Sequence, residues 1–404
     1  MRVIDVRTVM TGMREANPVD VADVLEQLAR PVGRDVTLYL VDFQQVVLQA
    51  MPSMVAPKVV PEENVATSLA GRAFTTAAAV TAERDDRVRV WVPMREQSVR
   101  TGVLAITVPV ADDATVAHCL GLGDLAGLLV AGAARYTDLM HVRRRGRGMS
   151  LAASMQWDLL PPLTLRTPQA TVSGLLEPAY EVAGDAFDYA LNADRLDVGL
   201  FDGMGHGIGS SMLTNLAVGA YRHARRDGLD VPDMHLAVDT AVAEQYDGDA
   251  FVTGVFARLQ LETGRLTWTN AGHPAPLLLR DRQVIGPLAC EPTPPFGLAG
   301  QLPPVQVEAL EPGDSLLLYT DGVTDARTHS GGELGLERLV DLLEREAAAE
   351  TSPEETLRRL IRSTLDFQGG ELRDDATLVL LRWSGPTPAA VTLPRQDLGT
   401  VTPG

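Results

Sequence analysis

At 404 residues the chain exceeds what one ordinary hydrophobic core accommodates, and we expect two domains. Its 45% hydrophobic and 22% charged residues exclude a wholly disordered chain, and its formal net charge of −18 argues against a nucleic-acid binder, which needs a basic face. Apolar runs such as 125–134 are too short to cross a bilayer and Met1–Glu15 holds no continuous signal-peptide core, so we expect a cytoplasmic protein with neither membrane nor nucleic-acid partners.

After a short N-terminal segment, 1–16, the first predicted domain covers 17–135 and mixes helices with strands. Strand-like runs of β-branched and apolar residues lie at Val36–Val41, Gln45–Ala50, Val88–Pro93 and Gly102–Pro109. Apolar spacing and Ala and Leu content predict helices at Val19–Leu28, Ser68–Thr76 and Leu120–Tyr136. Helices beside one antiparallel sheet predict an α+β domain.

Three strings in this segment resemble a GAF domain. They are SLAGRAFTTAAAV, VRVWVPM and TGVLAITVPV, and a long predicted helix follows them. The resemblance implies a GAF-like sensor domain over 17–135. The usual cyclic-nucleotide signature of such domains is absent, and we interpret His118 and His141 as surface residues and not as haem ligands. The sequence therefore predicts a sensor without identifying its ligand.

Residues 136–164 have the pattern of a helical connector between two domains. Apolar residues recur there at three- and four-residue steps, at Met149, Ala152, Met155 and Leu159. Such a stripe predicts a packing face and leaves open a homodimer through this helix. The Pro161-Pro162 pair is expected to end the helix. We expect a second domain at 165–383 and, because residues 384–404 are proline-rich and aperiodic, a disordered tail after it.

Two carboxylates of the second predicted domain lie at the ends of predicted apolar strands. Asp185 is predicted to end a strand that begins near Ala170, and Asp202 follows the strand 196–201. The turn residues at 191–194 predict that these two strands pair as a hairpin. Glycine follows Asp202 directly, which lets the backbone approach a ligand closely.

Two further carboxylates lie next to the ends of later predicted strands. Asp321 follows the strand 315–318, and Asp374 stands shortly before the strand 378–381. Two carboxylates about 4 Å apart repel by roughly 4 kcal/mol at an effective dielectric near 20, so four of them at one end of a sheet would destabilise the fold or become protonated. Oxygen ligands of this kind bind Mg²⁺ and Mn²⁺, and two such ions together activate a water for attack on phosphorus. Each Asp-Gly pair taken alone is more typical of a solvated turn.

Six ordered motifs resemble the metal-dependent protein phosphatases of the PPM type, in their bacterial SpoIIE-like branch. They are EVAGDAFD, FDGMGHGIGSSM, FVTGVFARLQLETGRLTWTNAGHPAPLLL, LEPGDSLLLYTDGVTDAR, GLERLVDLL and RDDATLVLLR. The resemblance implies an α-β-β-α sandwich of two antiparallel sheets over 165–383, with two Mn²⁺ or Mg²⁺ ions at one end. The expected fold class of the whole chain is therefore α+β, with a GAF-like domain before the sandwich.

The resemblance also assigns a role to each motif residue. The implied metal ligands are the carboxylates of Asp185, Asp202, Asp321 and Asp374 and the carbonyl of Gly203. Asp202 would bridge both ions, Asp185 would serve the second ion, and the other two carboxylates would hold the first. Asp188 and Asp375 would orient waters or the ligands themselves. Asp185 and Asp202 are thus the expected catalytic carboxylates.

Two histidines and three departures from the family pattern complete the predicted site. His206 would either protonate the leaving serine oxygen, order its glycine-rich loop or cap the helix that begins near Gly209. His273 is interpreted as a structural residue that hydrogen-bonds between strands. The departures are Ala183, Ala186 and Asp325, and none of them removes an implied ligand.

By this resemblance the chain is expected to hydrolyse phosphoserine or phosphothreonine on a protein. The implied substrate is a phosphorylated STAS-domain antagonist of an anti-sigma factor in bacterial partner switching, with the GAF-like domain and the connector setting activity. A non-catalytic sensor or adaptor is the rival hypothesis, although all four core aspartates are present. A hydrolase of the metallo-β-lactamase type would need clustered histidines, and the seven histidines of this chain form no close pair.

Overall fold

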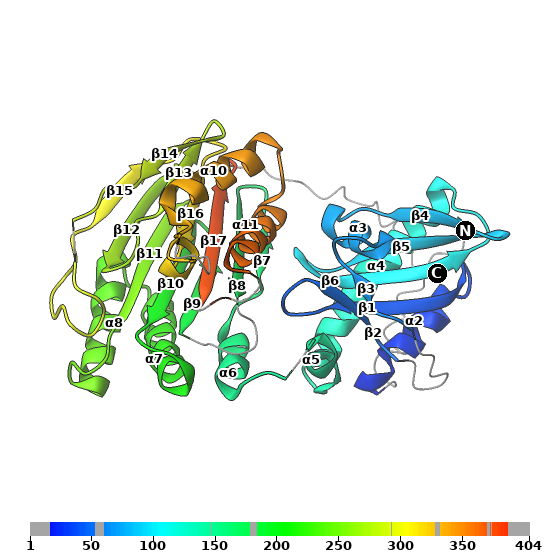
Figure 1. The fold of residues 1–404 in the computed structure, drawn as a ribbon, viewed down its shortest axis with the longest axis horizontal. Coiled ribbons are helices and arrows are strands. Elements are labelled where there is room, and N and C mark those ends of the chain that lie inside the picture. Colours follow the sequence, from blue (N-terminus) through cyan, green and yellow to red (C-terminus); the bar gives the residue numbers. More distant parts are fainter. Residues whose placement is uncertain are drawn as a thin grey trace, which may run out of the picture.

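The computed structural model describes residues 17–52, 60–146, 148–177, 184–291, 293–327, 332–369, 372 and 374–386. The described residues form three antiparallel sheets, arranged in an N-terminal lobe with one sheet and a C-terminal lobe with two (Figure 1). The predicted segment 1–16, Ala183 and most of the predicted tail, 387–404, lie outside the described residues.

The N-terminal lobe is a six-stranded sheet of order β3-β2-β1-β6-β5-β4. Its strands are β1 Arg34–Val41, β2 Val47–Ala50, β3 Glu63–Asn64, β4 Val80–Arg84, β5 Arg87–Glu96 and β6 Val99–Val108. The 3-10 turn η1 (Pro18–Asp20) leads into α2 (Val21–Ala29), which packs with α4 (Asp113–Ala134) on one face, and α3 (Leu69–Thr76) covers the other. The four predicted strands and three predicted helices are confirmed, whereas β3 and β4 were not predicted.

Helix α4 is longer than predicted because it begins at Asp113 and not at Leu120. Asp112 accepts a hydrogen bond from the Thr115 amide (2.8 Å), which caps the helix and fixes its start. By length and composition α4 could also cross a membrane, contrary to the expectation from shorter apolar runs. Its buried side packs against β5, β6 and α2, as the core helix of this lobe.

The connector between the lobes consists of two short helices, α5 (Leu139–Arg144) and α6 (Leu151–Leu159), and not of one continuous helix. Helix α6 ends shortly before the Pro161-Pro162 pair, as predicted. Part of the predicted apolar stripe packs within the chain, because Met149 contacts Phe43 of the N-terminal lobe and Ala152 is buried. The homodimer through this connector stays a prediction.

The C-terminal lobe is a sandwich of two antiparallel sheets. The five-stranded sheet, of order β15-β12-β11-β10-β9, contains β9 Asp185–Leu191, β10 Arg195–Gly203, β11 Val252–Gln260, β12 Arg265–Ala271 and β15 Gln306–Ala309. The six-stranded sheet, of order β14-β13-β16-β17-β8-β7, contains β7 Thr164–Arg166, β8 Ala170–Glu177, β13 Leu277–Arg280, β14 Gln283–Pro287, β16 Ser315–Tyr319 and β17 Ala376–Trp383. The β9–β10 hairpin is confirmed.

Helices cover both outer faces of this sandwich (Figure 1). They are α7 Gly207–Arg226 and α8 Val231–Tyr246 on the five-stranded sheet, and α10 Gly335–Ala348 and α11 Pro353–Gln368 on the six-stranded sheet, with the short α9 Asp321–Thr324 after β16. Alternation along β10 explains the layers: Val198 and Leu200 enter the core between the sheets, whereas Phe201 packs under the helices. The predicted α-β-β-α architecture is confirmed.

One predicted strand was wrong. The sequence suggested that Asp185 ends a strand beginning near Ala170, but β8 and β9 are separate strands that belong to opposite sheets. Asp185 is the first residue of β9. The two strands therefore lie in different layers of the sandwich, and the carboxylate stands at the start of the second strand.

Candidate metal centre

Two of the predicted ligands stand directly opposite each other in the five-stranded sheet. The β9–β10 register pairs Asp185 with Asp202, and side chains of directly paired residues are neighbours on one face. Phe187, two residues after Asp185, lies in the core between the sheets, so the same alternation turns both carboxylates toward the rim of that core. Like charges in such a pair are destabilising unless a cation or a proton separates them.

The six-stranded sheet adds the other predicted carboxylates at the same rim. Asp375 precedes β17 and is 3% exposed; its Oδ2 accepts hydrogen bonds from the amides of Gly184 (2.6 Å) and Asp185 (3.3 Å). These bonds join the start of β17 to the start of β9 across the sandwich. Asp321 begins α9 and, like Asp374, is exposed to solvent. Carboxylates from four separate parts of the chain are therefore brought together.

The carboxylates raise one another's pKa. Burial raises the pKa of Asp202 to about 7, with further contributions from the negative charges of Asp321, Asp374 and Asp375. Burial and the charges of Asp202 and Asp375 hold the pKa of Asp185 well above its usual range, and burial brings that of Asp375 to about 6. Burial and the neighbouring Asp374 also raise the pKa of Asp321. The rim is thus a site of unbalanced negative charge.

Two glycines let the backbone close up around these carboxylates. A Cβ atom on Gly203 would lie 2.3 Å from Thr214 Oγ1, and one on Gly322 would lie 2.0 Å from the carbonyl oxygen of Asp375. At both distances a Cβ atom would force its neighbour to shift, so both positions after these predicted ligand aspartates favour glycine for close approach. The sequence pattern Asp-Gly is therefore a packing requirement at this rim.

The residues at the rim fit a pair of hard divalent cations by the chemistry of their donors. All are oxygen donors, burial and then mutual repulsion raise the pKa of Asp202, and Asp375 Oδ1 is buried without a hydrogen-bond partner among the described residues. In the ranges that the structure describes, no three Asp, Glu, His or Cys side chains lie close enough together to bind a metal ion without rearrangement. The donor set is therefore assembled at one place but not closed into a coordination shell.

Two predicted site residues make contacts that differ from the expectation. Asp188 does not face the carboxylate rim: it lies on the other face of β9 and forms ion pairs with Arg222 and Arg225 of α7, each at 2.7 Å. The carbonyl of Gly203 accepts a hydrogen bond from Ser210 Oγ (2.8 Å). A role for Asp188 in orienting ligands is therefore corrected to a structural one, and the carbonyl ligand stays a prediction.

The two histidines differ in their surroundings. His206 is exposed at the N-cap position of α7, and its side chain makes no capping hydrogen bond, so the predicted cap is wrong and its role as an acid stays a prediction. The ring of His273 hydrogen-bonds through Nδ1 with Thr253 Oγ1 (2.8 Å) and through Nε2 with the Tyr319 carbonyl oxygen (3.1 Å), so it links the two sheets. Burial lowers the pKa of His273 to about 4. The structural interpretation of His273 is confirmed.

Two polar residues that the sequence did not single out support Asp185. Thr320 Oγ1 donates to its Oδ2 (2.7 Å), and Gln156 of α6 donates to its backbone carbonyl. Thr320 stands in the TDG motif and could have been found by its position next to Asp321. Gln156 could not, because nothing in the connector sequence predicts which face of α6 meets β9.

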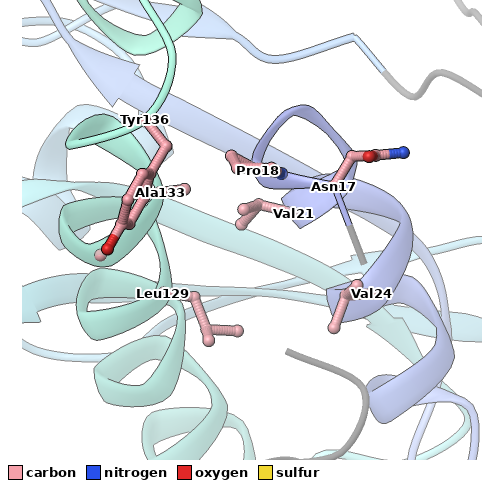
Figure 2. A pocket seen from close by; sticks show the side chains of 8 residues that line it. Asn17, Pro18, Val21, Val24, Leu129, Ala133 and Tyr136 are labelled. Atoms are coloured by element: carbon pink, nitrogen blue, oxygen red, sulfur yellow. The ribbon is translucent and has the colours of Figure 1, made fainter. Parts of the chain in front are cut away.

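An apolar pocket of about 210 Å³ lies in the N-terminal lobe, apart from the carboxylates. Figure 2 shows side chains from η1 and α2 facing those at the end of α4 across it. It is lined by Asn17, Pro18, Val21, Val24, Leu129, Gly132, Ala133 and Tyr136. Its lining carries no ionisable group that points to a particular ligand.

Comparison with known proteins concerns the C-terminal lobe. Residues 192–384 match the family model of stage II sporulation protein E (SpoIIE). The chain is similar to phosphoserine phosphatase RsbU of Bacillus subtilis (strain 168), with 24% identity over 238 residues that cover 58% of this chain and 69% of RsbU. Phosphoserine phosphatase RsbP of the same organism is 27% identical over 187 residues, which cover 44% of this chain and 45% of RsbP.

Among solved structures, the RsbU and RsbW domains of a Mycobacterium tuberculosis protein share 28% sequence identity with this chain. The TM-score is 0.48, and the match covers 55% of this chain and 63% of the other. The chain thus spans less than half of RsbP and less than two thirds of the mycobacterial structure.

Proposed function

We propose that this chain, whose residues 192–384 form a SpoIIE-type phosphatase domain of the PP2C class, is a cytoplasmic, metal-dependent serine/threonine protein phosphatase. One observation carries the proposal. Carboxylates from β9, β10, α9 and the start of β17 meet at one rim of the sandwich and raise one another's pKa. Such a cluster is costly to hold together without positive charge.

Asp185 and Asp202 would hold the ions from the five-stranded sheet, with Asp202 shared between them. Asp321 and Asp374 would hold the first ion, and the carbonyl of Gly203 would add a further oxygen donor. When bound, two divalent cations offset phosphoryl charge and lower the pKa of a water. Thr320 and Asp375 fix Asp185 in place through its carboxylate and its amide.

The proposed substrate is a protein phosphorylated on serine. RsbU and RsbP, to which this chain is similar, are phosphoserine phosphatases. By the resemblance of the sequence motifs, the substrate class is a phosphorylated STAS-domain antagonist of an anti-sigma factor. Incubating this chain with such proteins, purified in their serine-phosphorylated form, and measuring released phosphate tests the assignment.

The proposed regulator is the N-terminal lobe, acting through the connector. Gln44, in the β1–β2 turn, donates a hydrogen bond to Glu177 at the end of β8. Glu177 pairs in the sheet with Ala376, which directly follows Asp375. Phe43 of the same turn packs against Trp157 of α6 with the two rings tilted, and the ring centroids are 4.6 Å apart. These contacts support a GAF-like sensor that adjusts the active site in the same chain.

Hydrolysis of p-nitrophenyl phosphate tests the enzymatic proposal. We expect turnover with Mn²⁺ that EDTA abolishes, and we expect Asp202→Asn to lower it by more than about a hundredfold because the shared ligand is lost. Asp194→Asn makes the same change at the opposite end of the β9–β10 hairpin and is expected to leave turnover unchanged. Folded protein without metal-dependent turnover would instead favour the non-catalytic adaptor.

A further inference from the structure

The segment that leads from Asp202 into α7 exposes large apolar side chains beside the carboxylate rim. Met204, Ile208 and Met212 are 41%, 49% and 55% exposed. Ile208 and Met212 lie one helical turn apart on the solvent side of α7, while Ser210, Ser211 and Leu213 are buried. We call Met204, Ile208 and Met212 the α7 patch.

The α7 patch directly follows Asp202 in the chain, on a helix that is anchored to the backbone of the proposed active site. Met204 is two residues from Asp202, and its amide donates to the Phe251 carbonyl (3.1 Å) at the start of β11. Ser210 and Thr214, on the buried side of the same helix turns, donate to the carbonyls of Gly203 and Gly184. The helix that presents the patch therefore also packs on the backbone next to two predicted ligands.

The segment that carries the α7 patch has no formally charged residue of its own, although the chain is strongly acidic. From Gly203 to Tyr221 the sequence contains no Asp, Glu, Lys or Arg, whereas the chain as a whole carries a formal charge of −18. This segment has no Lys or Arg to attract a phosphorylated, negatively charged partner over a distance, and the nearby Asp321 and Asp374 add negative charge. Affinity for such a partner has to come from short-range contacts, which exposed apolar side chains supply and which flexible methionine adapts to different shapes.

We infer that the α7 patch is the docking surface for the phosphoprotein substrate, and that it binds an apolar surface next to the phosphoserine. Met212 lies two residues from both Ser210 and Thr214, so it leaves the opposite side of α7 from the residues that contact the backbone at the rim, and a small phosphate ester at Asp202 would not contact it. A folded protein does reach it. This inference rests on the proposed phosphatase function and adds the part of the enzyme that selects a protein over a small ester.

The test compares two substrates in the full chain with Mn²⁺ present: p-nitrophenyl phosphate and a serine-phosphorylated STAS-domain protein. For Met212→Glu, and for Met212→Ala as a milder variant, we expect kcat/KM for the protein to fall, by about tenfold or more for the charged variant and mainly through KM. Turnover of p-nitrophenyl phosphate is expected to stay within about twofold. Ile285→Glu, at an equally exposed apolar position on β14, is the matched control and is expected to change neither substrate.

Four outcomes would overturn the inference. An unchanged KM for the phosphoprotein would remove the docking role, and an equal loss on both substrates would mean that Met212 supports the catalytic centre. A loss that accompanies a change from dimer to monomer in light scattering would assign the patch to a second copy of the chain. A wild-type chain that hydrolyses p-nitrophenyl phosphate but no phosphoprotein would leave nothing to dock. Lack of turnover of p-nitrophenyl phosphate would instead contradict the proposed function itself.

Discussion

The face of β9 on which an aspartate lies determines which groups its carboxylate contacts. Asp185 and Asp188 lie three positions apart on β9, so their side chains leave opposite faces. Asp185 reaches the rim between the sheets, and Asp188 reaches Arg222 and Arg225 under α7. Both residues are aspartates and both are 2% exposed, yet Asp185 faces other carboxylates whereas Asp188 already pairs with two arginines.

Gly322 is the residue at which this rim is most tightly closed. We expect Gly322→Ala to raise the Mn²⁺ concentration for half-maximal hydrolysis of p-nitrophenyl phosphate by about tenfold or more, because the new Cβ would meet the Asp375 carbonyl at 2.0 Å and push Asp321 away from β17. Gly219→Ala is the control, since a Cβ there meets nothing within 4 Å. Equal Mn²⁺ dependence in both variants would contradict this account of the Asp-Gly pattern.

At the level of elements, much of the site could be predicted from the sequence. Carboxylates next to one end of an apolar strand, two of them followed directly by glycine, identified Asp185, Asp202, Asp321 and Asp374, which the fold brings to one rim. Strand alternation in the motif around Asp185 also contained the signal that Asp188 faces the opposite way. Using that signal requires knowing where β9 begins, and the prediction of one strand running from near Ala170 to Asp185 placed that start wrongly.

Other contacts could not be predicted because they depend on how separate elements pack. The connector sequence indicated an apolar stripe, but its buried polar residue, Gln156, is what meets Asp185. Likewise, nothing in the β1–β2 turn predicts that Phe43 packs against Trp157 or that Gln44 reaches Glu177. Side chains that join two lobes have no periodic pattern, since each lobe alone would leave them at its surface.

Helix α6 is the element through which the N-terminal lobe can reach the metal centre. Trp157 contacts Phe43 of the N-terminal lobe, and the adjacent Gln156 donates to Asp185. An aromatic pair contributes about 1 kcal/mol, so we expect Trp157→Ala to raise the Mn²⁺ concentration for half-maximal activity by up to about fivefold. The measurement is a Mn²⁺ titration of p-nitrophenyl phosphate hydrolysis by the full chain. Asp158→Asn, exposed on the same helix, is the control, and identical titrations for both variants would argue against coupling through α6.

For the whole molecule, the raised pKa values make metal-free stability depend on pH. Asp202 titrates near 7 and Asp375 near 6 in the folded chain, against 3.8 for an unperturbed Asp. Between pH 3.8 and about pH 7 the folded chain binds more protons than the unfolded chain, so the free energy of unfolding falls as pH rises. The stability that protonated carboxylates retain at pH 5 is therefore lost by about pH 7 to 8.

Divalent cations reverse this loss, because they bind the deprotonated carboxylates and only the folded chain assembles them. We expect excess Mg²⁺ to raise the melting temperature more at pH 8 than at pH 5, measured by thermal unfolding with EDTA-treated protein as the reference. In Asp202→Asn both the fall of metal-free stability with pH and the gain from Mg²⁺ should shrink, since one titrating ligand is gone. An equal gain at both pH values would mean that the ion binds elsewhere, because a site made of these carboxylates has to exchange protons for metal.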